Sequence, residues 1–188
     1  MIYSTYHGEI VELPEENLLL LGLCYAERSR RIVAEFDEFY NEELSKHFVN
    51  ELDKAFDYLL DTSTFSSSIE IGEDSKELEQ ILPDTEDFPE MQGGLALSGL
   101  SILCYCYRYM LTKQPENISY ILNLAFEITD AICIVSNGKF NYDTEWQKEL
   151  DLLAEYIEII NAHQVFDENA IVLLREMNSK NAFANPTA

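Results

Sequence analysis

The stretch Leu95-Ala-Leu-Ser-Gly-Leu-Ser-Ile-Leu-Cys-Tyr-Cys-Tyr-Arg-Tyr-Met-Leu111 is the most hydrophobic segment of the chain, and Arg108 is its only charged residue. It is slightly shorter than the ~20 residues that a membrane-spanning helix needs, and Ser98, Gly99 and Ser101 dilute its hydrophobicity. A helix that is apolar on all sides is also what the centre of a helical bundle requires. We therefore predict a buried central helix, with a membrane span as the alternative.

A second apolar helix is predicted over residues 118–136, after a turn around Pro115. Asn137-Gly138 is a good left-handed stop for it. The two segments form a helical hairpin at the centre of the predicted bundle. Small residues in the first segment, Gly94, Ser98 and Gly99, would let a neighbouring helix approach closely.

The rest of the chain also has helical spacing of apolar residues. Long helices are predicted over 14–40 and 42–61, a further helix from Thr144, and a last one over 168–177. A short helix fits 75–82 with Ser75 as its N-cap, and the Ser- and Thr-rich stretch 62–68 is predicted to be a loop. The sequence thus predicts an all-α, single-domain bundle of about six helices with a central apolar hairpin. Residues 1–178 form the domain and 179–188 a frayed C-terminal tail with little to bury.

The charge balance is the most unusual property of the composition. Lys and Arg number 12 against 35 Asp and Glu, which gives a formal charge of -23. A field of this sign repels phosphate backbones and anionic lipids, so nucleic acid and membrane surfaces are poor partners, whereas a basic protein would be attracted. The alternative interpretation is that acidity only keeps the protein soluble.

Local ion pairs are expected in the first predicted helix, and a pair across the hairpin is an alternative. Arg28, Arg30 and Arg31 lie among acidic residues of the first predicted helix and suit local pairs at i,i+3 and i,i+4. Glu127 and Asp130 interrupt the apolar surface of the second segment and are expected on its solvent edge, with a pairing to Arg108 across the hairpin as the alternative.

The four cysteines, Cys24, Cys104, Cys106 and Cys133, all lie in apolar stretches and form no CxxC pair. We expect them to behave as small buried hydrophobes in a reducing compartment. Residues 1–13 contain acidic side chains and no basic region of a signal peptide. Together these features predict a cytoplasmic protein.

No catalytic or cofactor-binding motif is present, whether a P-loop, GxGxxG, GxSxG, HExxH or EF-hand loop. His47 and Glu51 are one helical turn apart, but no second histidine supports a metal site there. The sequence therefore predicts neither cofactor nor metal nor enzymatic activity. A carboxylate-metal enzyme, with Glu127 and Asp130 in the core of the bundle, is kept as an alternative.

The acid-rich segment from residue 70 to residue 90 is the best candidate for a functional site. Carboxylates at this density repel one another unless a cation or a basic partner relieves them. We predict a partner-binding surface here, with a solvated loop as the alternative. The predicted binding residues are Glu70, Glu73, Asp74, Glu77, Asp84, Glu86, Asp87 and Glu90.

The order of several phrases resembles a known family. Cys24-Tyr-Ala-Glu-Arg28 follows an apolar run, Leu82-Pro-Asp-Thr-Glu-Asp-Phe88 precedes the helix from Gly94, and Glu145-Trp146 leads a Leu-rich helix. This order resembles the YjaG-like family of small bacterial all-helical proteins, over about residues 18–162. The family has no settled biochemical activity, so the resemblance implies the fold. Diverged acidic versions of such domains resemble the immunity proteins of bacterial toxin systems, which are small, cytoplasmic and bind one cognate toxin.

Three functions follow as hypotheses. The first is an immunity protein that binds and neutralises a cognate, basic toxin protein. The second is a housekeeping YjaG-like homodimer, and the third is the carboxylate-metal enzyme.

Overall fold

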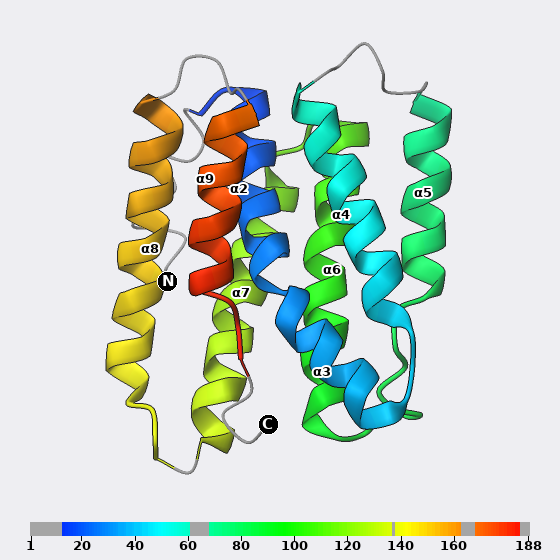
Figure 1. Ribbon diagram of the computed structural model, residues 1–188, viewed down its shortest axis with the longest axis vertical. Helices are drawn as coiled ribbons and strands as arrows, with labels where there is room; N and C mark the ends of the chain where they lie inside the picture. The colour runs from blue at the N-terminus through cyan, green and yellow to red at the C-terminus, as the bar shows by residue number, and fades with distance from the viewer. Residues whose placement is uncertain (1–12, 61–67, 137, 163–167, 185–188) are drawn as a thin grey trace.

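The computed structural model describes residues 13–60, 68–136, 138–162 and 168–184. Within these ranges the chain forms eight α-helices and no strand, which confirms the predicted all-α bundle (Figure 1). The helices are α2 (Glu15–Arg28), α3 (Arg30–Tyr40), α4 (Leu44–Leu60), α5 (Ser68–Gln80), α6 (Met91–Thr112), α7 (Glu116–Val135), α8 (Tyr142–Ala162) and α9 (Glu168–Lys180).

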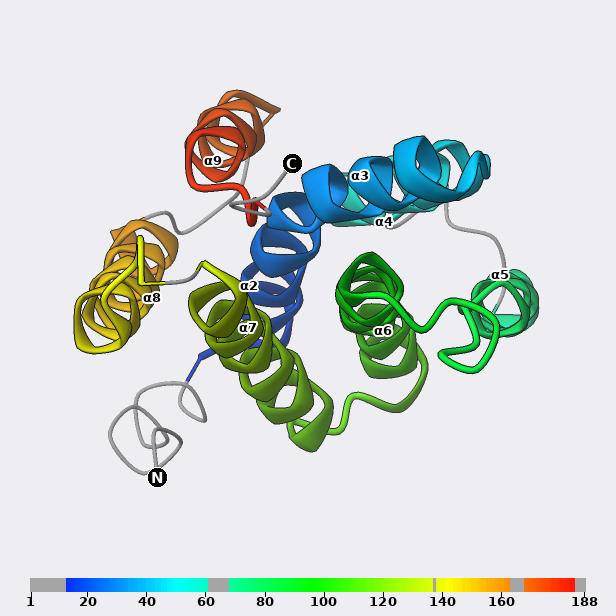
Figure 2. The ribbon, with the colours of Figure 1, turned by 90° about the horizontal axis from the view of Figure 1, so that it is seen from below.

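Helices α2, α6 and α7 form the centre of the bundle. Figure 2 shows α8 and α9 on one side of α2, with α5 at the opposite edge beside α6. The predicted burial of the apolar segment 95–111 is confirmed, since Leu100, Leu103 and Tyr107 in α6 have no exposed surface. The sequence did not anticipate that α2 is equally central: every residue from Leu18 to Arg28 is buried.

Glycines allow two close approaches between these helices. A Cβ atom at Gly22 of α2 would lie 3.0 Å from Ile121 of α7 and 3.1 Å from Cys106 of α6. A Cβ at Gly99 of α6 would lie 3.0 Å from Ser29, so the expected close packing is found there. At Gly94 an added Cβ meets no atom within 4 Å, so that glycine does not serve helix packing.

The single helix predicted over 14–40 is divided at Ser29. The N–H of Ser29 donates to the Ala26 carbonyl, and its hydroxyl donates to the Tyr25 carbonyl at 3.2 Å. Such back-bonding by serine bends helices. The bend directs α3 along α6, where Ile32, Val33 and Phe36 become buried.

Helix α5 also differs from the prediction. The short helix expected over 75–82 extends from Ser68 to Gln80, and its start lies beside the predicted loop 62–68, of which 61–67 are outside the described residues. Ser75 is therefore not an N-cap but a buried residue of the helix interior. The buried residues Ile71, Ser75 and Leu78 recur at helical spacing, and this short stripe holds α5 on the bundle.

The C-terminal residues are more ordered than the predicted tail over 179–188. Helix α9 extends to Lys180, and Phe183 is only 4% exposed. The Phe183 N–H donates to the Arg28 carbonyl at 3.0 Å. We call residues 181–184 the C-terminal strap. The prediction of fraying is wrong for the strap, because Phe183 is buried against Arg28, which lies far away in the sequence. Residues 185–188 are outside the described part.

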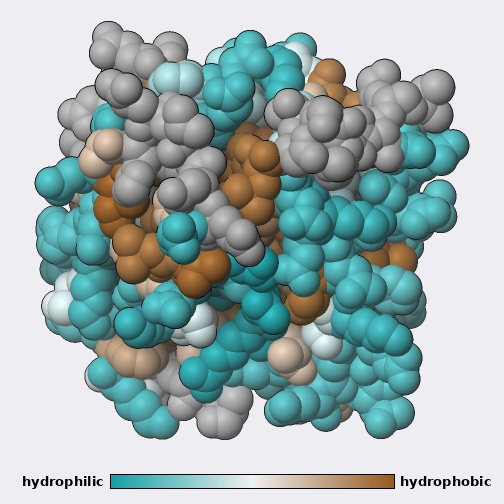
Figure 3. Space-filling model, turned by 45° about the horizontal axis from the view of Figure 1, so that its top comes forward, coloured by the Kyte–Doolittle hydropathy of each residue, from teal (hydrophilic) through white to brown (hydrophobic). Residues whose placement is uncertain are grey.

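The surface differs between the two sides of the molecule. In Figure 3 the side of α4 and α5 is mainly hydrophilic, whereas hydrophobic residues gather on the opposite side near helix ends. Of the described helices, α7 alone is long and apolar enough to cross a membrane, and half of its apolar window is buried inside the bundle.

Candidate functional site

The structure divides the predicted acidic site between α5 and the loop that follows it. We call residues 84–90 the acidic loop. The residues on α5 are Glu70, Glu73, Asp74 and Glu77, and those on the acidic loop are Asp84, Glu86, Asp87 and Glu90. All are exposed except Asp74, which is half-buried and lies 3.3 Å from the Lys54 ammonium of α4. The segment is therefore not one continuous loop.

The exposed acids of α5 form a stripe on one face of the helix. Glu70, Glu73 and Glu77 are spaced by three and four residues, which places them one above the other. The face is turned away from the buried stripe of α5. Arg108 of α6 holds α5 in place through hydrogen bonds of 3.0 and 2.8 Å to Glu79. Arg108 thus pairs with Glu79 and not with Glu127 or Asp130, the alternative partners considered above, whereas Glu127 is exposed at the solvent edge as expected.

The acidic loop is held in a defined conformation. The Asp84 carbonyl accepts hydrogen bonds from the N–H groups of Asp87 and Phe88, at 3.1 and 2.9 Å. The Asp84 carboxylate accepts another from the Glu86 N–H at 2.8 Å. Each of these bonds restricts the backbone, so the loop presents its carboxylates from a fixed position.

Aromatic packing and a glycine attach this loop to the bundle. The Phe88 ring meets Phe36 and Tyr40 of α3 edge-on, with centroids 5.0 and 4.9 Å apart. A Cβ at Gly93 would lie 2.1 Å from the Phe88 carbonyl oxygen, so the loop can lie against α6 only because residue 93 has no side chain.

A groove of about 420 Å³ lies between the acidic loop and the start of α4; we call it the acidic groove. Its apolar side chains are Phe36, Leu44, Ile81, Leu82, Pro83 and Phe88. Its acidic side chains are Glu42, Glu43, Asp84 and Asp87, and His47 also lines it. Glu42 and Glu43 were not predicted as site residues. The signal that could have identified them is their position in a polar break between two amphipathic helices.

Glu127 and Asp130, the two carboxylates of the metal-enzyme hypothesis, lie in different surroundings. Glu127 is exposed and lines a separate hollow of about 310 Å³ beside Glu90. Asp130 accepts a hydrogen bond from the Trp146 indole of α8. In the part of the chain that the structure describes, no three His, Cys, Asp or Glu side chains are grouped closely enough to hold a metal ion.

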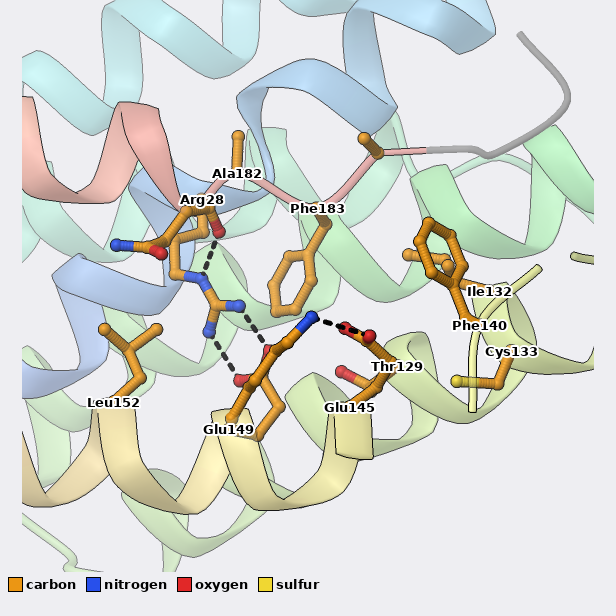
Figure 4. Close-up of a pocket in the computed structure, with 13 residues that line it drawn as sticks. Arg28, Thr129, Ile132, Cys133, Phe140, Glu145, Glu149, Leu152, Ala182 and Phe183 are labelled. Atoms are coloured by element: carbon orange, nitrogen blue, oxygen red, sulfur yellow. Dashed lines mark hydrogen bonds and ion pairs between the residues drawn. The ribbon is translucent and has the colours of Figure 1, made fainter. Parts of the chain in front are cut away.

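A second site lies between α2 and α8, around a buried ion pair. The Arg28 guanidinium of α2 donates to both carboxylate oxygens of Glu149 in α8, at 2.7 and 2.5 Å. The two side chains are only 4% and 9% exposed. In Figure 4 the Glu149 side chain reaches Arg28 from α8, and the Phe183 ring lies beside the guanidinium.

The C-terminal strap completes this arrangement. The Arg28 Nε–H donates to the Asn181 carbonyl at 2.7 Å, and the guanidinium carbon lies 4.0 Å from the centroid of the Phe183 ring. Burial is the largest influence on the pKa of Arg28 and lowers it. The hydrogen bond and the charge of Glu149 lead the opposing influences, which leave the pKa above its ordinary value. Arg28 and Glu149 also line a pocket of about 260 Å³.

The neighbouring arginines are paired as well. Arg30 binds Glu27 at 2.7 Å and Arg31 binds Glu35 at 2.9 Å, which confirms the predicted local pairs. Glu27 is itself 4% exposed and has a second, long-range partner in Arg175 at 3.0 Å. Local spacing predicted the first contacts, but nothing in the sequence pointed to the long-range ones. Because each of these arginines already forms an ion pair with a carboxylate, the cluster stabilises the packing of the helices and does not offer a free cationic surface.

All four cysteines are buried and free, as predicted. Burial raises the pKa of the Cys24 and Cys104 thiols to about 12. Since the thiolate is the reactive form, these thiols are unsuited to nucleophilic chemistry near neutral pH.

Comparison with known proteins supports the fold. No family model matches the chain, and no curated protein matches its sequence. The fold is similar to that of a solved structure, a DUF416 family protein from Shewanella baltica OS155. The TM-score is 0.80, the sequence identity is 16%, and 95% of each chain is covered. At this identity the likeness shows the shared helical architecture alone.

Proposed function

We propose that this chain is an acidic macromolecule-binding protein, most specifically an immunity protein that binds and neutralises a cognate bacterial toxin domain. The observation that carries the proposal is the set of exposed carboxylates on α5 and the acidic loop. Within the described residues, Glu70, Glu73, Glu77, Glu86 and Asp87 have no ion-pair partner, although arginines elsewhere in the protein are paired. The helical fold and the resemblance to the YjaG-like family are compatible with this function.

Electrostatics gives the expected partner its chemistry. A net charge of -23 attracts a basic protein over long distances and repels nucleic acids and anionic membranes. Complementary charge chiefly accelerates association, so binding should be fast at low salt and slow down as salt is added. A basic toxin domain in the same cytoplasm would meet both conditions.

The test begins with the partner recovered by a tagged pull-down from the native host, at low and high salt. The double variant Glu86→Lys/Asp87→Lys should reduce the association rate by about tenfold or more at low salt. The matched control, Glu155→Lys/Glu158→Lys, makes the same change of net charge on exposed positions of α8. Equal rates for the two variants would remove the acidic loop from the interface.

A homodimer of the YjaG-like kind is the second candidate, and one observation favours it. Val172 and Leu173 of α9 are 51% and 55% exposed, which is unusual for adjacent large apolar residues. If they form a dimer interface, light scattering should give twice the chain mass, and Leu173→Lys should return a monomer. A pull-down that recovers only the bait, together with a dimeric mass, would favour this function over the immunity protein.

A further inference from the structure

The acidic groove combines features that the exposed acidic face of α5 lacks. Glu70, Glu73 and Glu77 project from one exposed helix face, but the groove is a hollow built from two segments far apart in the sequence. Contacts of Phe88 with Phe36 and Tyr40 bring these segments together. Its walls are therefore fixed by the fold.

The lining of the groove has two kinds of surface. The half-buried Leu44, Ile81 and Leu82 contribute apolar area, and Phe88 adds an aromatic ring. Four exposed carboxylates, Glu42, Glu43, Asp84 and Asp87, surround this area. In the described part of the chain no Lys or Arg lines the groove, and none of these four carboxylates has an ion-pair partner there. The apolar surface favours methylene groups, and the carboxylates favour a positive charge.

We propose that the acidic groove is an anchor pocket for one long cationic side chain, Arg or Lys, that projects from a basic partner protein. The inference rests on the proposed function, since it names the chemistry that the same acidic end recognises. The aliphatic stem lies along Leu44, Leu82 and Phe88, and the charged head reaches Glu43 and Asp87. Lys and Arg side chains cover apolar surface with their stems in this way while their heads remain near polar groups.

Arginine should be preferred over lysine. Its planar guanidinium can stack on the Phe88 ring and donate to two carboxylates at once, whereas an ammonium is a point charge. The groove volume of about 420 Å³ accommodates a side chain of this size. A single short cation would leave the apolar part of the groove uncovered.

The test uses the full chain, isotopically labelled, and the peptide acetyl-Gly-Leu-Arg-Leu-Gly-amide as the probe. NMR titration follows the His47 imidazole and the Phe88 ring, both of which line the groove. Three further peptides replace arginine by lysine, by citrulline, which keeps the length without the charge, or by diaminopropionic acid, which keeps a charge on a short stem. The expected order of affinity is Arg, Lys, diaminopropionic acid, with citrulline at least tenfold weaker than Arg.

Matched variants locate the binding. Glu43→Gln/Asp87→Asn should weaken the arginine peptide at least tenfold, and Glu73→Gln/Glu77→Gln on α5 should leave its affinity within about twofold. Equal weakening by both pairs, or binding of the citrulline peptide as tight as that of arginine, would overturn the proposal. The proposed function fails separately, if no partner protein is recovered. If a partner protein binds at α5 but the arginine peptide does not bind in the groove, only the anchor-pocket proposal is refuted.

Discussion

The buried ion pair between Arg28 and Glu149 gives the most demanding prediction for stability. Glu149→Met would leave the guanidinium of Arg28 buried without its counter-charge and without two of its three hydrogen bonds. Removing one partner of a buried pair costs about 3–5 kcal/mol. In a domain of this length, 1 kcal/mol shifts the melting temperature by about 2–4 °C, so we expect a decrease of roughly 6–20 °C.

The double variant Arg28→Met/Glu149→Met separates charge from packing. The double variant leaves no buried charge without a partner. It loses the hydrogen bond of Arg28 to Asn181 and its contact with Phe183, each of which contributes about 1 kcal/mol. An apolar replacement of a buried pair is often close to neutral. We therefore expect the double variant to be more stable than Glu149→Met by about 1–3 kcal/mol.

The assay is urea unfolding followed by circular dichroism and by the fluorescence of Trp146, the single tryptophan. Arg31→Met is the control, because the Arg31 side chain is 57% exposed and its pair with Glu35 should contribute less than about 1 kcal/mol. A loss below about 1 kcal/mol for Glu149→Met would refute the reasoning. So would a double variant no more stable than the single one.

Three further predictions concern other parts of the fold. Gly93→Ala should lose about 1–3 kcal/mol, since the new Cβ would overlap the carbonyl of the acidic loop, whereas Gly94→Ala meets no atom and should gain about 0.5 kcal/mol by calorimetry. Phe183→Ala should lose about 3 kcal/mol and expose the C-terminal strap to carboxypeptidase. The free energy of unfolding should fall between pH 9 and about pH 12, because the pKa of the Cys24 and Cys104 thiols is 9.0 in the unfolded chain and about 12 in the folded protein. Labelling of the folded protein by a thiol reagent at pH 8 should be correspondingly slow. Rapid labelling would contradict the burial of these thiols.

Hydrophobic spacing was enough to predict the helical hairpin of α6 and α7, because both helices are long and apolar and a proline turn separates them. It failed for α5, whose buried stripe is short and is obscured by the acids around it. It also failed at Ser29, where neither proline nor glycine marks the break. The bend depends on the hydrogen bond of the Ser29 hydroxyl and on the close approach of Ser29 to Gly99. The spacing of apolar residues in one sequence cannot predict such contacts.

The candidate sites show the same limit. Composition and local charge density indicated the acidic residues of α5 and the acidic loop. The pairing of Arg28 with Glu149 joins residues 121 positions apart, so no local pattern contains it. Glu42 and Glu43 likewise belong to the acidic groove only because Phe88 packs against α3. The charged residues can be identified from the sequence, but only the three-dimensional fold shows which of them lie in the same site.

The two sites lie in different parts of the bundle, and this separation makes the predictions independent. The ion pair joins α2, α8 and the C-terminal strap, while the acidic groove is built by α3, α4 and the segment before α6. Variants of the ion pair should therefore change the free energy of unfolding without changing the affinity for the arginine peptide. Groove variants are exposed and should change that affinity with little effect on stability. A groove variant that also unfolds the protein would mean that its carboxylates support the acidic loop rather than a partner.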